Sequence, residues 1–156
     1  MKLHDLLTEK MIIPELQSED SESVLKEMII FLKANNKITK EKELYEKLIQ
    51  REKLGSTAIG EGVAIPHCKI KAIKNPIVLL AISKKGVDFK SIDGNLSHIF
   101  FLVVSSLDNP SLNLQILAAI AQLVRKADSL KEKILKAGNP RSITDIIRQA
   151  EEKLNG

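Results

Sequence analysis

The chain has 156 residues, of which 24 are Lys or Arg and 20 are Asp or Glu, so its net charge is +4. This length favours one domain, and 44% apolar with 28% charged residues is a globular balance that argues against disorder. Aliphatic residues must fill the core, because the chain has 21 Leu, 20 Ile and 7 Val but only four Phe, one Tyr and no Trp. The shortage of aromatic residues also argues against a protein that stacks the bases of single-stranded nucleic acid on aromatic side chains.

The chain lacks the sequence signs of export, of disulfide chemistry and of membrane insertion. The N-terminus, beginning with residues 1–5, has no long apolar stretch of a signal peptide, and no window approaches the roughly 20 apolar residues of a membrane helix. Because Cys68 is the single cysteine, an internal disulfide, a cysteine-rich zinc site and a CxxC redox pair are excluded. We therefore expect a cytoplasmic protein without direct membrane insertion.

Two helices are predicted in the first third of the chain. Residues 20–35 carry apolar side chains at helical spacing after a polar start, and Asn35-Asn36 ends this helix. Thr39 is expected to cap the second helix, which has Gly55 beyond its end. The apolar positions are Val24, Leu25, Met28, Phe31 and Leu32 in the first helix and Leu44, Leu48 and Ile49 in the second.

The middle of the chain changes from helical spacing to short, continuous apolar runs. Residues 77–82 follow Pro76 and end before Lys84-Lys85-Gly86, and residues 99–104 follow the turn Asp93-Gly94-Asn95. Runs of this length between turns are typical of strands that are covered on both faces. We expect both runs to be central strands.

Helices return in the last third of the chain. Asn109 can cap a helix with Pro110 at its first position, and a short helix over residues 130–135 ends near Gly138. The run Ser142-Ile143-Thr144-Asp145 resembles a capping box that opens the last helix. Helices on both sides of central strands predict the α/β class, as a three-layer α/β/α sandwich with a central mixed β-sheet, although the pattern does not give the strand order.

The segment 51–69 carries the candidate chemistry. It holds three of the seven glycines, and its apolar run Val63-Ala64-Ile65 leads into Pro66, which fixes φ and removes a backbone donor at a strand end. His67 follows, so its side chain is held beside a rigid residue at a strand terminus. A lone histidine is more often structural than reactive, and position alone only suggests that His67 reacts.

The residues around His67 resemble the active-site signature of the phosphotransferase-system enzyme IIA domains of the fructose/mannitol type, which include the nitrogen-regulatory enzyme IIA proteins. That signature has an acidic or amide residue, an aliphatic-Gly pair, then aliphatic-Ala-aliphatic-Pro-His and a small residue. The matching positions here are Glu52, Ile59-Gly60, Val63-Ala64-Ile65, Pro66-His67 and Cys68. The similarity extends along essentially the whole chain, which implies a single enzyme IIA domain over residues 1–156.

The resemblance implies a phosphoryl carrier of the phosphoenolpyruvate-dependent phosphotransferase system. His67 would accept a phosphoryl group from HPr or a related phosphocarrier. It would then donate the group to the enzyme IIB of a fructose/mannitol-type sugar permease, or its phosphorylation state would control a regulated protein. Neutral imidazole is a nucleophile near pH 7, and the P–N bond that it forms stays reactive. The family needs no metal or organic cofactor, and we expect none here.

Four residues in the same segment are candidates for supporting His67. Arg51 stands sixteen residues before it, where family members carry an Arg, and a guanidinium suits phosphoryl oxygens. Ser56 and Thr57 could donate hydroxyl hydrogen bonds to phosphate or could only cap a turn. Glu61 could orient His67 or contact the partner, but it could equally be a solvated loop acid.

Asn113 is a departure from the family pattern. Sugar-transporting relatives often carry a second histidine near the start of the helix after the last central strand, and Asn113 occupies that position. An Asn can hydrogen-bond a phosphate or hold the other ring nitrogen of His67, but it supplies neither positive charge nor a proton. The positive end of the helix that begins at Asn109-Pro110 can offset this loss.

Three classes of function stay open from the sequence. The leading hypothesis is the phosphoryl carrier, in its transport or its regulatory branch. The second is an enzyme IIA-like regulatory module that binds proteins without efficient phosphoryl transfer; Asn113 supports it and the intact Pro66-His67 pair opposes it. The third is a small nucleic-acid binder, which the lack of a basic helix and of an aromatic platform argues against, so we expect no nucleic-acid partner.

Overall fold

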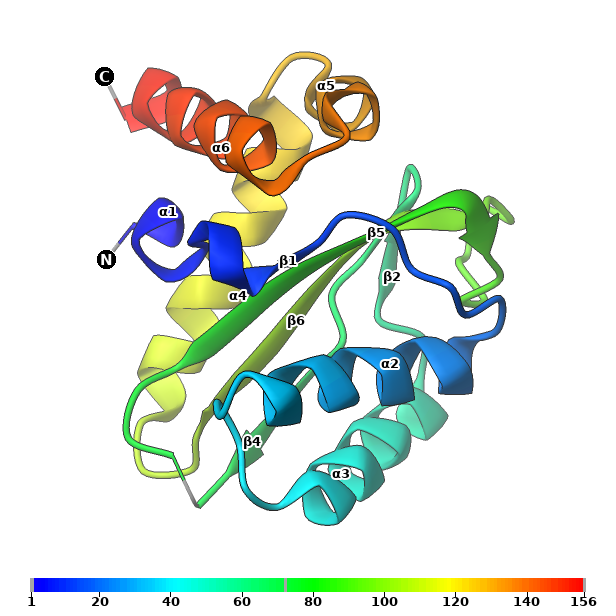
Figure 1. Cartoon of the computed structure of the whole chain (residues 1–156), viewed down its shortest axis with the longest axis vertical. Coiled ribbons are helices and arrows are strands. Elements are labelled where there is room, and N and C mark those ends of the chain that lie inside the picture. Colours follow the sequence, from blue (N-terminus) through cyan, green and yellow to red (C-terminus); the bar gives the residue numbers. More distant parts are fainter. Residues whose placement is uncertain (1, 72, 156) are drawn as a thin grey trace.

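Helices and strands follow one another in blocks, and the helices cover a central sheet (Figure 1). The computed structural model describes residues 2–71 and 73–155. Within these ranges, no helix is both long and apolar enough to span a bilayer. The elements in chain order are α1 (Leu3–Leu6), the 3-10 helix η1 (Glu9–Met11), β1 (Ile12–Ile13), α2 (Ser21–Ala34), α3 (Glu41–Leu54), β2 (Ala58–Gly60), β3 (Val63–Ala64), β4 (His67–Ile70), β5 (Ile77–Val87), β6 (Ser97–Ser106), α4 (Pro110–Lys126), α5 (Leu130–Ala137) and α6 (Pro140–Asn155).

The long strands β5 and β6 form the centre of the sheet. They pair antiparallel, with Ile77 opposite Val104 and Ile82 opposite Ile99. β1 lies parallel to β5, while β3 and β4 both lie parallel to β6, one after the other along its other edge. β2 pairs antiparallel with β3. The sheet is therefore mixed, and the predicted α/β class is confirmed.

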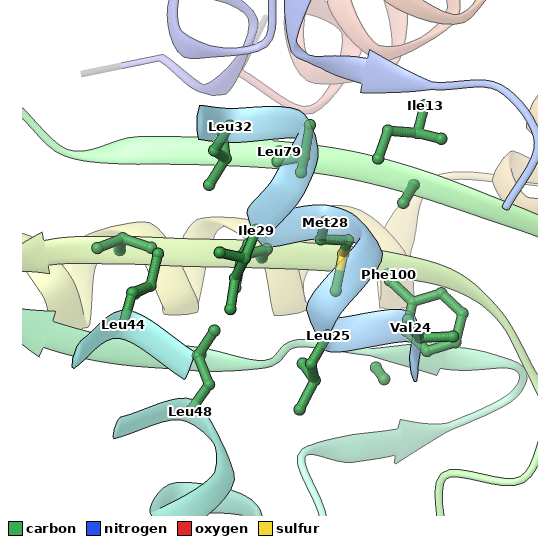
Figure 2. Packing of buried hydrophobic residues seen from close by; sticks show 14 of the residues in the cluster. Ile13, Val24, Leu25, Met28, Ile29, Leu32, Leu44, Leu48, Leu79 and Phe100 are labelled. Atoms are coloured by element: carbon green, nitrogen blue, oxygen red, sulfur yellow. The ribbon is translucent and has the colours of Figure 1, made fainter. Parts of the chain in front are cut away.

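Each face of the sheet has its own core, because successive side chains of a strand point to opposite faces. On β6, Phe100 and Leu102 belong to the core under α2 and α3, whereas Phe101 and Val103 belong to the core under α1, α4, α5 and α6. Helices thus cover both faces, as a three-layer arrangement requires. Figure 2 shows the first core, in which the helix residues Val24, Leu25, Met28, Ile29, Leu32, Leu44 and Leu48 gather over Leu79 and Phe100.

The two central strands are longer than their apolar runs indicated. β5 continues to Val87, with an irregular register between Ile82 and Val87. Gly86 makes this possible: its φ is +88°, and a Cβ atom at this position would lie 2.8 Å from the ring of His98. The lysines before it were expected to end the strand, but their side chains are exposed and pairing with β6 resumes beyond them, where Val87 lies opposite Ser97.

The start of α3 differs from the prediction. Thr39 was expected to be its cap, but the helix begins at Glu41 and its N-cap is Lys40, which makes no side-chain cap hydrogen bond. Glu41 and Glu43 lie in the first turn instead. Their carboxylates complement the positive end of the helix dipole, which replaces part of what a capping side chain supplies.

The start of α6 corrects a second prediction. The capping box expected at Ser142 is wrong, because the helix already begins at Pro140 and the Asn139 side chain accepts the Ser142 N–H at 2.9 Å. The same Asn-Pro pair opens α4, where the predicted cap is confirmed: Asn109 accepts the Leu112 N–H at 3.3 Å. Proline suits the first helical position because its missing donor would have no helical partner there.

This difference gives a stability prediction. Asn139→Ala is expected to lower the free energy of unfolding by about 1 kcal/mol, because the Ser142 N–H loses its acceptor. Ser142→Ala is the matched control and should change stability by only a few tenths of that amount, since its hydroxyl caps nothing. Urea unfolding followed by circular dichroism measures both variants. A larger loss in Ser142→Ala than in Asn139→Ala would contradict the cap assignment.

Candidate functional site

His67 is the first residue of β4, and its ring is fixed by a backbone contact. Its Nδ1 lies 2.7 Å from the carbonyl oxygen of Ile65. A carbonyl oxygen only accepts hydrogen bonds, so Nδ1 carries the proton and donates it. In the neutral ring the lone pair therefore resides on Nε2, which is the nitrogen left free to react.

The segment before His67 is held in place by pairing on both sides. The Ile65 N–H donates to the Thr57 carbonyl at 2.9 Å, and the Pro66 carbonyl accepts the Val103 N–H at 2.9 Å. Pro66 itself has no N–H to satisfy and lies buried between the two short strands. The backbone that presents the Ile65 carbonyl is thus tied to β6 and to the end of the α3–β2 loop.

Burial and nearby positive charge both act on the His67 ring. Burial, the largest effect, lowers the pKa of His67 because it disfavours the charged ring, and the charges of Arg51 and Lys69 lower it further. The hydrogen bond to Ile65 acts in the opposite direction and is weaker than burial. His67 is therefore neutral at pH 7, which is the state that a nucleophile needs.

Arg51 lies in the last turn of α3, and its positive charge contributes to the lowering of the His67 pKa. Its Nη1 donates to the Gly55 carbonyl at 2.8 Å, which holds the side chain against the loop that follows the helix. A guanidinium has five N–H donors, and this contact uses one of them. The other N–H donors of Arg51 are not used by this contact.

Asn113 lies in the first turn of α4. This helix covers the face of the sheet towards which His67 points, because His67 alternates with Cys68, which belongs to the core on the other face. The Asn113 side chain is only 3% exposed, and its Oδ1 accepts the hydroxyl of Ser105 at 2.6 Å. Ser105 lies opposite Lys69 on β4, two residues beyond His67 and on the same side of the strand. This contact occupies the carbonyl end of the amide, and the Asn113 Nδ2 forms no hydrogen bond with the described residues.

The hydroxyl groups of Ser56 and Thr57 bind to residues outside their own loop. The Ser56 hydroxyl donates to the Phe89 carbonyl and accepts the Ala58 N–H at 3.0 Å. The Thr57 hydroxyl donates to the Glu52 carboxylate, and Thr57 is 4% exposed. These contacts anchor the loop that leads to Ile65, through Ser56 to Phe89 and through Thr57 to the last turn of α3, and they use both hydroxyl protons.

Glu61 lies at a distance from His67. It stands in the β2–β3 turn with φ +56°, and its N–H donates to Asp93 at 2.8 Å. Val63 lies opposite Ile99 while His67 lies opposite Val103, four residues further along β6, which corresponds to about 13 Å of strand. The register thus separates Glu61 from His67, whereas Asn113 binds Ser105 on the side of β6 that faces the same way as His67.

Cys68 faces away from His67. It belongs to the core under α2 and α3, and burial raises the pKa of its thiol to about 12. A thiol that stays protonated is a poor nucleophile, so Cys68 fills space. In the described ranges no group of three or more His, Cys, Asp or Glu side chains could hold a metal ion.

Sequence reasoning missed two polar residues that organise the site. In the sequence Glu52 marks only one position of a motif, but in the structure it binds Thr57 with both carboxylate oxygens. Ser105, which holds Asn113, ends the apolar run of β6 and was not singled out. A buried serine at a core-facing position of a strand is the signal that could have indicated a polar partner on the covering helix.

Comparisons with proteins of known sequence identify relatives along nearly the whole chain. Residues 5–150 match the family model described as Phosphoenolpyruvate-dependent sugar phosphotransferase system, EIIA 2. The PTS system fructose-specific EIIABC component of Bacillus subtilis is 33% identical over 149 residues, which cover 96% of this chain but only 23% of that protein. The nitrogen regulatory protein of Bradyrhizobium diazoefficiens is 35% identical over 132 residues, 85% of this chain and 86% of that protein.

Solved structures share the fold. The nitrogen regulatory protein IIA-Ntr from Neisseria meningitidis superposes with a TM-score of 0.84 at 22% identity, covering 93% of this chain and 98% of that chain. A chain from the complex of Escherichia coli mannitol enzyme IIA with phosphorylated enzyme IIB has a TM-score of 0.74 at 15% identity, covering 90% and 95%. At these identities the likeness concerns the arrangement of helices and strands.

The electrostatics of the site predict a pH response. The pKa of His67 should lie below its ordinary value of 6.5, and Arg51→Gln should raise it, because the lost positive charge no longer disfavours the imidazolium. Lys53→Gln, a neighbouring change of the same charge on the same helix, should leave it within measurement error. Titration of the ring resonances by NMR measures all three proteins. A His67 pKa that is the same in Arg51→Gln as in the unchanged protein would remove Arg51 from the site.

Proposed function

Because the chain belongs to the EIIA 2 family of the phosphoenolpyruvate-dependent sugar phosphotransferase system, we propose that it carries a phosphoryl group on Nε2 of His67. The observation that carries this proposal is the Nδ1–H···O=C hydrogen bond to Ile65 at 2.7 Å. It leaves Nε2 as the only ring nitrogen with a lone pair in a neutral, half-buried imidazole.

The transfer step follows from that protonation state. The Nε2 lone pair forms the new N–P bond while the N–P bond of the incoming phosphohistidine breaks, and the donor imidazole leaves with that electron pair. The His67 ring gains positive charge as the bond forms, because Nδ1 keeps its proton. The Ile65 carbonyl stabilises this charge, and its effect on the pKa of His67 has the corresponding upward direction. Little else is required beyond alignment and charge stabilisation.

In this proposal, two side chains hold the phosphoryl oxygens. The Arg51 guanidinium supplies a fixed cation with remaining N–H donors. The Asn113 amide nitrogen is directed by the bond between its Oδ1 and Ser105. Ser56, Thr57 and Glu61 act less directly in this proposal: the first two shape the loop before Ile65, and Glu61 lies near the β2–β3 turn, where it could contact a partner.

Protein partners fit the surface beside the site. Leu54, three residues after Arg51, is 86% exposed, and Leu114, next to Asn113, is 66% exposed. Exposed apolar side chains around a polar centre suit a transient protein interface. We propose an HPr-like phosphocarrier as donor and an enzyme IIB or a regulated protein as acceptor, both in the cytoplasm.

Phosphoryl labelling tests the proposal and its alternative, a binding module without efficient transfer. Incubation with enzyme I, HPr and labelled phosphoenolpyruvate should yield an acid-labile phosphate on the unchanged protein and none on His67→Ala. Circular dichroism of His67→Ala controls for folding. The absence of labelling with every HPr-like carrier tried would reject the carrier and favour the binding module.

The role of Arg51 gives a kinetic prediction. Arg51→Ala should slow phosphoryl exchange at least about tenfold, which corresponds to the loss of about 1.4 kcal/mol of transition-state stabilisation. Arg148→Ala is the matched control, because Arg148 lies on α6 and pairs with Asp145 at 3.0 Å. Rapid-quench kinetics with phosphorylated HPr measures both rates. An equal rate in Arg51→Ala and Arg148→Ala would show that Arg51 does not act on the transferred group.

A further inference from the structure

We propose that Glu52 is a positioning residue that holds His67 in its reactive tautomer through a chain of three hydrogen-bonded links. The chain runs from the Glu52 carboxylate to Thr57, from Thr57 to Ile65, and from Ile65 to the His67 ring. The inference rests on the proposed function, since it concerns the same histidine. It adds a role for Glu52, which the proposed transfer step does not use.

The first link joins the end of α3 to the loop that follows it. Glu52 lies in the last turn of the helix, and its Oε2 accepts the Thr57 N–H at 3.1 Å while its Oε1 accepts the Thr57 hydroxyl. Both donors of Thr57 are thus bound by one side chain. Thr57 is 4% exposed, so water cannot easily replace that side chain if it is removed.

The next two links pass through the backbone. The Thr57 carbonyl accepts the Ile65 N–H at 2.9 Å, and the Ile65 carbonyl accepts the His67 Nδ1–H at 2.7 Å. The strands between them are short, and the β2–β3 pairing is irregular between Ala58 and Gly60. The few hydrogen bonds between β2 and β3 hold such a hairpin only weakly. The position of the Ile65 carbonyl therefore depends on the hydrogen bonds that Thr57 makes with Ile65 and with Glu52.

Glu52 acts through geometry in this proposal and not through its charge. The charges that shift the pKa of His67 are those of Arg51 and Lys69. Burial of Glu52 raises the pKa of its own carboxyl, against the hydrogen bonds from Thr57. A glutamine could make the same two contacts, because its carbonyl oxygen can accept the Thr57 N–H and its amide can donate to the Thr57 hydroxyl oxygen.

The test compares Glu52→Ala with Glu52→Gln. Nitrogen-15 NMR of the unphosphorylated protein gives the tautomer of His67, and quench kinetics with phosphorylated HPr gives the transfer rate. Glu52→Ala should convert a measurable fraction of the ring to the Nε2–H tautomer and slow transfer by about tenfold. Glu52→Gln should keep the Nδ1–H tautomer and stay within about threefold of the unchanged rate.

Two further variants keep the outcome decisive. Glu46→Ala removes an exposed carboxylate from the same helix and should change neither quantity. Thr57→Val keeps the N–H contact and loses the hydroxyl contact, so it should give a smaller shift of tautomer, and it decides the question if Glu52→Ala fails to fold. An unchanged tautomer in Glu52→Ala, or in Thr57→Val where Glu52→Ala does not fold, would overturn the proposal.

Failure of this inference and failure of the proposed function are distinguishable. The tautomer is measured without any phosphoryl donor, so a shift in Glu52→Ala supports positioning even if His67 is never labelled. Conversely, normal labelling of the unchanged protein together with an unshifted tautomer in Glu52→Ala leaves the carrier function in place and rejects the role of Glu52.

Discussion

The hydrogen bond from His67 Nδ1 to the Ile65 carbonyl is the contact on which the arrangement of the site depends. It selects the nitrogen that carries the proton, and so it selects the nitrogen that can react. It also restrains rotation of the ring, because the donor and acceptor are only two residues apart. In the proposed function, Arg51 and Asn113 act on a group carried by a ring held in this way, since a phosphoryl group can be aligned only on a nitrogen of fixed direction.

The sheet supplies the second constraint, because it directs neighbouring side chains of a strand to opposite faces. Alternation along β4 sends His67 to one face and Cys68 into the core on the other face. The same alternation on β6 places Ser105 where it can hold Asn113. One short strand therefore has one face that carries His67 and another face that packs into the core.

The sequence allowed the α/β class, the central strands and the Asn109-Pro110 cap to be predicted, because these depend on local periodicity and local capping. Thr39 and Ser142 were wrong as caps, because the preference of a side chain for the capping position does not distinguish between neighbouring helix starts. Acidic residues lie in the first turn of α3 instead, and Asn139 caps α6. The links from Glu52 to His67 could not be predicted. They depend on pairing between Thr57 and Ile65, which only the folded hairpin brings together.

The buried thiol of Cys68 has a consequence for measuring motion at the site. Cys68 follows His67 in β4 and is the single cysteine of the chain. Cys68 is only 9% exposed, so its alkylation rate should rise when this strand separates from α3 or from the sheet, and it reports on the opening of that region. The chain thus contains a natural probe, one residue from the proposed phosphoryl site, for following how substitutions or partners loosen or tighten the strand that presents the histidine.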